Sequence, residues 1–319
     1  QRQIARRLML HGIVGSAGLA FLAACGSESS GDTTALSSAP VATVPPGTQV
    51  AVAATTTQIQ DFVENVGGNR ITVTGILKPN VDPHDYEPTV EDANAIAKAD
   101  IVFVHGIGLD SWMDKTVKGA SVKAPVITTT DGIKTLKGDA NDPQGDPHVW
   151  FDPTLVQTMV VNIANGLAKV DPTHANAYQV NATSYVNQLT QLDGQLKSIF
   201  TPVPKEQRKL VTNHDAFRYL ANRYDLTIVG AVIPSLSDTA EPSARQLSDL
   251  IDTIKKERVK AIFAESSANP KVAQQVAKET GIAIIDTLYG DTLGEPGSAG
   301  DTYVKMMVYD ATTIVNAIK

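Results

Sequence analysis

The sequence has a single cysteine in 319 residues, which excludes a disulfide framework and a thiolate-rich zinc or iron–sulfur site. It also lacks a basic excess, because 27 Lys and Arg stand against 34 Asp and Glu, for a net charge of −7. Nucleic-acid binders carry the opposite balance, so we expect no nucleic-acid partner. Beyond the N-terminus, no apolar run approaches the roughly 20 residues of a membrane helix. The remaining composition, 42% hydrophobic and 19% charged, predicts an acidic globular protein of about two domains.

The N-terminus has the pattern of an export signal. Three arginines precede an apolar run over residues 8–22, which predicts a signal peptide over residues 1–24, although the Arg6-Arg7 pair leaves the export route open. The run ends in Leu-Ala-Ala-Cys, which resembles the lipobox of bacterial lipoproteins, so Cys25 is expected to carry a lipid rather than to be a core thiol. Residues 25–48 are rich in Ser, Thr, Gly and Pro and are predicted to form a flexible tether. We therefore expect an extracytoplasmic protein anchored to the membrane through Cys25.

From residue 49 onward, short β-rich runs alternate with helical patterns, once in each half of the chain. This alternation predicts an α/β fold of two lobes, each a mainly parallel sheet flanked by helices. The lobes are expected at residues 49–171 and 204–319. The predicted strands are residues 50–56, 70–77, 100–106 and 124–128 in the first half, and 209–213, 226–233, 260–265 and 282–286 in the second.

One long helix is predicted between the lobes, over residues 172–203. Its apolar residues recur at spacings of four and three: Tyr178, Ala182, Tyr185, Leu189, Leu192, Leu196 and Ile199. Pro172 suits the start of a helix, and Pro202 and Pro204 end it. A single helix of this length predicts a rigid connection.

Polar groups suited to metal binding are found at four places that end or follow predicted strands. These are DPHDYEPT at 82–89, DPHVWFDP at 146–153, NHDAF at 213–217 and GDT at 290–292. In the first motif, Thr89 and Asp92 form a capping-box pattern; in the second, Asp152 is a plausible N-cap before Pro153. The carboxyl ends of parallel strands are where α/β sheets bind ligands. Three neutral imidazoles and one carboxylate would complete a four-coordinate shell for a divalent cation.

These motifs resemble those of the metal-binding lipoproteins of manganese and zinc ABC transporters, the cluster A-I solute-binding proteins. The resemblance covers residues 49–319 and also includes ESSANP at 265–270 and the segment from Gly290 to Met307. Carried over by position, it implies that the metal ligands are His84, His148, His214 and Asp291. Asp286 is the alternative carboxylate; we prefer Asp291 because its distance of eleven residues from Thr302 fits the family pattern.

The resemblance implies a function and a set of partners. We expect the protein to capture one Zn²⁺ or Mn²⁺ per chain in the cleft between the lobes, and to deliver it to an ABC permease. It is expected to be a monomer and not an enzyme. The choice of metal has conflicting signals. His214 stands where manganese-binding members often have Glu, whereas Glu265-Ser266-Ser267 resembles manganese-type and mixed-specificity members. Nitrogen-rich shells favour zinc, so we lean towards zinc.

The other candidate residues have weaker signals. His105 ends a strand and is expected at most near the site, whereas His174 is expected on a solvated helix face and His11 in the signal peptide. Glu87 and Glu265 are candidates for orienting the imidazoles from outside, or for ion pairs. The alternative functions are a surface adhesin with a structural metal and a zinc hydrolase. A hydrolase needs an open metal position and a general base, and no HExxH motif occurs.

Overall fold

The computed structural model describes residues 43, 45 and 47–319, except 120–121, 139–142 and 238–239. The predicted signal peptide, Cys25 and nearly all of the predicted tether lie outside the described residues. Within the described part, no helix has both the length and the apolar character needed to cross a membrane.

The first lobe contains a parallel sheet of four strands in the order β2-β1-β3-β4. Its strands are β1 (Val50–Ala54), β2 (Ile71–Gly75), β3 (Ile101–Val104) and β4 (Val126–Thr128), and helices α1 (Thr57–Gly67), α2 (Val90–Lys98) and α3 (Trp112–Gly119) connect them. All four residues of the central strand β3 are buried, as expected for a parallel sheet covered on both faces. The two parallel sheets confirm the predicted fold class.

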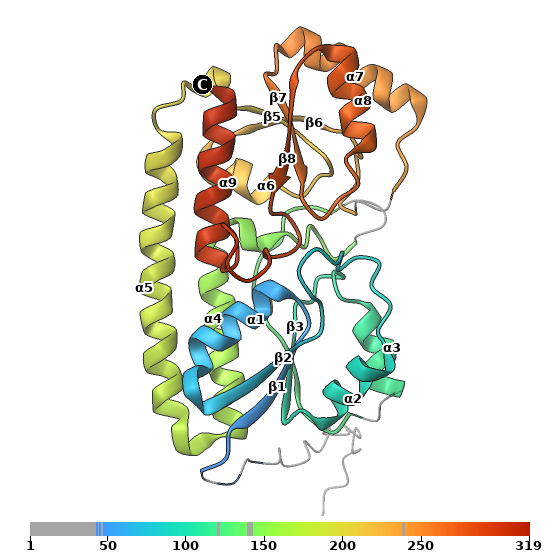
Figure 1. The fold of residues 1–319 in the computed structure, drawn as a ribbon. Helices are drawn as coiled ribbons and strands as arrows, with labels where there is room; N and C mark the ends of the chain where they lie inside the picture. The colour runs from blue at the N-terminus through green and yellow to red at the C-terminus, as the bar shows by residue number, and fades with distance from the viewer. Residues whose placement is uncertain (1–42, 44, 46, 120–121, 139–142, 238–239) are drawn as a thin grey trace, which may run out of the picture. The chain divides into compact units, whose positions relative to one another are not determined.

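The second lobe repeats the arrangement, with the strand order β6-β5-β7-β8 (Figure 1). Its elements are β5 (Lys209–Thr212), α6 (Arg218–Tyr224), β6 (Thr227–Ala231), α7 (Ala244–Glu257), β7 (Ala261–Glu265), α8 (Lys271–Thr280), β8 (Ala283–Leu288) and α9 (Tyr303–Ile318). Every residue of the central strand β7 is buried. Each predicted strand overlaps an observed one, although the strands are generally a few residues shorter than predicted.

The long helix α5 (Ala175–Phe200) connects the lobes and contacts α1, α4 (Pro153–Val170) and α9 (Figure 1). The predicted apolar stripe lies on its buried side, and Pro172 begins a short 3₁₀ turn ahead of the helix rather than the helix itself. The largest apolar cluster follows this helix and is continuous from the strands of the first lobe to those of the second. Because α5 packs against both lobes through this cluster, bending of the helix would disrupt the packing. The lobe boundaries stay predictions.

Two predicted helix starts in the ligand-bearing loops are confirmed. Thr89 and Asp92 form a reciprocal capping box at the start of α2. Asp152 caps α4 by accepting a hydrogen bond from the backbone N–H of Thr154, and Pro153 is the first residue of the helix. These caps fix where the loops that carry His84 and His148 end.

Two buried aspartates accept hydrogen bonds from tyrosines of α5 but are stabilised in opposite protonation states. Burial raises the pKa of Asp61 to about 6, in spite of a hydrogen bond from the Tyr185 hydroxyl. Burial also opposes the charge of Asp171, but hydrogen bonds from Tyr178 and His174 prevail and lower its pKa. The ionised Asp61 carboxylate therefore destabilises the folded protein at neutral pH, whereas the ionised Asp171 carboxylate stabilises it.

Asp61→Asn is expected to stabilise the metal-free protein at pH 7 by about 1–2 kcal/mol, because two pKa units correspond to at most about 3 kcal/mol and the amide adds an unpaired donor. A raised folded pKa means that the native state binds the proton more tightly, so wild-type stability falls as pH rises from about 4 to 6. The gain from Asp61→Asn should vanish at pH 4. Urea unfolding at both pH values measures it. Asp171→Asn is the control and should destabilise at pH 7; stabilisation by both variants would contradict this account.

Candidate metal centre

Four side chains from four loops bring their ligand atoms together between the two sheets. The structure brings together all four residues expected from the sequence, and their ligand atoms lie within 4.8 Å of one another. The Nε2 atoms of His148 and His214 are 3.3 Å apart, and each lies 3.4 Å from an oxygen of Asp291. The Nε2 atom of His84 lies 3.6 Å from the same carboxylate. A divalent cation at the centre of this group would meet three imidazole nitrogens and a carboxylate.

The repeated Asp-Pro-His sequence folds the same way at both of its positions. Asp82 accepts a hydrogen bond from the backbone N–H of His84 at 2.8 Å, and Asp146 accepts one from that of His148 at 3.0 Å. Aspartate readily closes such a turn two residues ahead, and the intervening proline restricts the backbone. The motif therefore holds each imidazole in a tight turn.

Two carboxylates hold the outer nitrogens of two of these imidazoles. Oδ1 of Asp146 lies 2.8 Å from Nδ1 of His148, and Oε2 of Glu265 lies 2.8 Å from Nδ1 of His214. All four side chains are buried. The hydrogen bond between His148 and Asp146 fixes the tautomer of His148, so that its Nε2 is free to bind a metal. In both pairs the carboxylate charge beside Nδ1 strengthens Nε2 as a donor.

Of the two glutamates predicted to orient the imidazoles, only one lies beside an imidazole in the structure. Glu265 lies where an orienting carboxylate was predicted, whereas Glu87 is exposed. Such a role was not predicted for Asp146, although its place two residues before His148 in the repeated motif was the available signal. The alternative ligand Asp286 is an exposed residue of β8 and lies outside the group.

The loop that carries Asp291 leaves the second lobe but is held by side chains of the first. The indole N–H of Trp150 donates to the carbonyl of Gly290 at 3.2 Å, and the backbone N–H of Leu293 donates to the hydroxyl of Thr57 at 2.8 Å. A side chain at Gly290 would collide with Glu265, because an added Cβ would lie 2.4 Å from its Cγ. Glycine at 290 thus allows the loop to pass close to the His214 partner.

Without a metal, the charges of the group hold protons on two of the imidazoles. Burial disfavours the charged form of His148, but Asp146 and Asp291 outweigh it and raise its pKa to about 10. Burial likewise opposes the charge of His214, whose pKa Glu265 and Asp291 raise to about 9. Burial would raise the pKa of Asp291, but the imidazoles hold it well below its usual value. An incoming cation must therefore displace protons.

The other two histidines of the described residues, His105 and His174, lie outside the group. His105 is buried, its pKa is lowered by burial to about 4, and its Nε2 lies 2.8 Å from the carbonyl of Pro147. Its ring contacts that of Trp150, which in turn contacts the ring of His148. His105 therefore supports the wall of the site, as expected for a nearby residue. His174 pairs with Asp171 at the start of α5 and is partly exposed.

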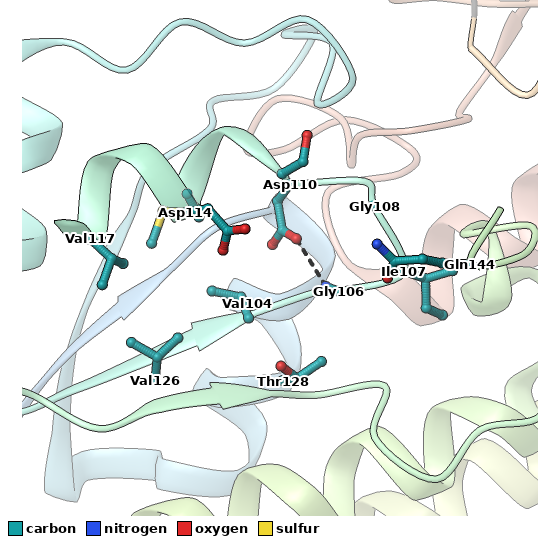
Figure 2. A pocket seen from close by; sticks show the side chains of 12 residues that line it. Val104, Gly106, Ile107, Gly108, Asp110, Asp114, Val117, Val126, Thr128 and Gln144 are labelled. Carbon is teal, nitrogen blue, oxygen red and sulfur yellow. Dashed lines mark hydrogen bonds between the residues drawn. The ribbon is translucent and has the colours of Figure 1, made fainter. Parts of the chain in front are cut away.

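A separate cavity of about 330 Å³ lies at the carboxyl ends of β3 and β4 (Figure 2). Its walls include Val104, Val126 and Asp110, but none of the four grouped residues. The Asp110 carboxylate already accepts hydrogen bonds from Thr55 and from the backbone N–H groups of His105 and Gly106. Asp110 thus braces the strand ends, and the lining residues include none of the described groups of three or more potential metal ligands.

The outer carboxylates provide a test of the site. Asp146→Asn and Glu265→Gln are each expected to weaken metal binding by about 10- to 100-fold, because each leaves its imidazole less firmly oriented and a weaker donor. Titration against a competing chelator measures the loss. The control is Glu87→Gln, which removes an exposed carboxylate and should bind like wild type. Unchanged affinity in both outer variants would show that these contacts do not support the ligands.

The family to which the chain belongs follows from its similarity to known proteins. The family described as "ZnuA: Zinc-uptake complex component A periplasmic" matches residues 52–317. The chain belongs to this family. The predicted membership of the manganese and zinc solute-binding lipoproteins is thus confirmed, and the chain is a metal-transport binding protein rather than an enzyme.

Similar proteins carry names of both metals. The chain is 34% identical to the manganese-binding lipoprotein MntA of Bacillus subtilis over 278 residues, which cover 85% of this chain and 90% of MntA. It is 32% identical to the metal ABC transporter substrate-binding lipoprotein SloC of Streptococcus mutans, with the same coverage. Among solved structures, the periplasmic zinc-binding protein TroA of Treponema pallidum matches with a TM-score of 0.78 at 28% identity, over 85% of this chain and 99% of TroA. These names leave zinc and manganese both open.

Proposed function

We propose that this protein is an extracytoplasmic solute-binding lipoprotein that captures Zn²⁺ or Mn²⁺ between its lobes and delivers it to an ABC permease. The observation that carries the proposal is the convergence of His84, His148, His214 and Asp291 from both lobes on one point. Three of these side chains are buried and His84 is partly buried, which limits the access of water to the ligand atoms. The family supplies the context of metal uptake.

The donor set favours zinc, as the sequence suggested. Three imidazoles outnumber the carboxylate, and affinity for nitrogen ligands increases from manganese towards the later divalent metals. Asp291 could supply both oxygens to a larger ion, because its Oδ1 faces His148 and its Oδ2 faces His84 and His214. Manganese is therefore accommodated by a fifth contact, at lower affinity.

The lipid anchor belongs to the same proposal. Similar proteins of this family are called lipoproteins, and the motif ending at Cys25 supplies a lipid acceptor. We infer that the protein is a monomer, anchored at the extracytoplasmic face of the membrane that contains its permease. Neither the adhesin nor the hydrolase alternative gains a specific observation. Asp146 and Glu265, the carboxylates nearest the ligands, face imidazole nitrogens rather than an open position for water.

The experiment that tests the function is a metal titration of the full chain. The protein is stripped with a chelator and then titrated with Zn²⁺ and with Mn²⁺. One equivalent of either ion should bind, with zinc tighter. The lack of saturable binding of both ions, or binding of several equivalents of equal affinity, would overturn the proposal.

A further inference from the structure

A cation of the second lobe contacts the carboxylate that orients His148. Arg218 is the first residue of α6, and its Nη1 lies 3.5 Å from Oδ2 of Asp146. The same Nη1 donates a hydrogen bond to the carbonyl of Lys137 at 2.9 Å, and Nε lies 3.7 Å from the carboxylate of Asp215. The Asp146 side chain is fully buried, whereas that of Arg218 is 29% exposed. The guanidinium therefore adds positive charge at the edge of the metal centre.

The two orienting carboxylates consequently differ in charge environment. Asp146 faces both His148 and Arg218. Glu265 faces His214, and none of the described Lys or Arg side chains forms an ion pair with it. Glu265 therefore interacts with His214 without a competing cation among the described side chains, whereas Asp146 interacts with both His148 and Arg218.

The shared charge has a predictable effect on the metal. A carboxylate bound to Nδ1 strengthens Nε2 as a donor, and a cation that holds the same carboxylate reduces this effect. The guanidinium also repels a divalent cation directly, through a buried region where charges are weakly screened. Both effects weaken metal binding without changing any ligand.

We propose that Arg218 acts through the charge of Asp146 to lower the affinity of the centre and to speed release of the metal. The proposal rests on the proposed function, because it concerns the same site. A binding protein that delivers its ion must also release it, and a cation outside the ligand set achieves this without removing a ligand.

A purely mechanical role for Arg218 is the alternative, since it also holds the loop before His148. The neighbouring Tyr219 already performs that role. Its hydroxyl donates to the carbonyl of Asp146 at 2.9 Å and accepts from the backbone N–H of Leu136 at 2.9 Å. Tyr219 therefore holds both ends of this loop. Loss of Arg218 should change the charge around Asp146 more than it changes the position of the loop.

The test separates charge from clamping with two substitutions. Arg218→Gln removes the charge, whereas Arg218→Lys keeps it and loses the guanidinium geometry. The full-length variants are loaded with Zn²⁺ or with Mn²⁺ and mixed with excess EDTA, and the rate of metal release is measured. The control is Arg245→Gln, which removes a charge from an exposed pair with Asp249 on α7.

Arg218→Gln should release both ions about tenfold more slowly, the lower range for changes to outer partners. Arg218→Lys and Arg245→Gln should release them at close to the wild-type rate. Faster release from both Arg218 variants would indicate a clamp, and an unchanged rate in Arg218→Gln would indicate no role. Either result overturns this inference and leaves the proposed function standing. A wild-type protein that binds neither ion would overturn the proposed function, and this inference with it.

Discussion

Replacing His148 with alanine should lower metal affinity by more than about 100-fold, a larger loss than an outer partner causes. His148 has the highest raised pKa of the group, faces both Asp146 and Asp291, and is fully buried. Its removal takes away one of the three imidazole nitrogens of the group. Equilibrium titration with Zn²⁺ against a chelator of known affinity measures the loss.

Two controls make the result interpretable. His174→Ala removes a histidine that lies at the start of α5 and pairs with Asp171, so metal affinity should stay at the wild-type value. A circular dichroism melt of metal-free His148→Ala establishes that the variant is folded. Wild-type affinity in a folded His148→Ala protein would show that this imidazole is not a ligand.

Metal should also stabilise the fold strongly, which is the second large effect. An ion that binds only the native state adds about 4 kcal/mol when its free concentration is 1,000 times the dissociation constant. For a folded region of this size, that corresponds to a rise in melting temperature of about 8–16 °C. The four grouped side chains come from both lobes, so the gain should appear in a single unfolding transition.

The metal-dependent gain should shrink as pH falls. In the metal-free protein the pKa values of His148 and His214 lie at about 10 and 9, above the value of 6.5 in the unfolded chain. These protonated imidazoles stabilise the metal-free form at low pH, and that contribution disappears as pH rises through 9 and 10. Metal requires the neutral form, so its advantage is largest at high pH. Scanning calorimetry at pH 8 and pH 5.5 tests this, and a shift that is equal at both would contradict the assigned ligands.

Local sequence signals predicted the two parallel sheets and three of the four side chains that the structure groups together. Alternating short apolar runs and helical patterns predicted both parallel sheets, since buried parallel strands are continuous apolar runs. The repeated Asp-Pro-His predicted two tightly turned imidazoles, because its aspartate and proline act within three residues. His214 was found because it directly follows a strand.

The remaining features depend on contacts between distant segments. Asp291 is preferred over Asp286 in the sequence by resemblance and because Asp286 sits inside the predicted strand end. In the structure Asp286 is an exposed residue of β8, whereas the loop past Trp150 carries Asp291 into the group. Glu265 reaches His214 from another strand, and Arg218 reaches Asp146 from the other lobe. No local pattern encodes such pairings, because they arise only when the two lobes pack together.

The most direct measurement of the central claim is a crystal structure of the metal-loaded protein, with anomalous diffraction recorded at the absorption edge of zinc or manganese. We expect one anomalous peak per chain, within direct bonding distance of Nε2 of His84, His148 and His214 and of the Asp291 carboxylate. A principal peak at Asp286, or at any position not bonded to these four side chains, would contradict the account.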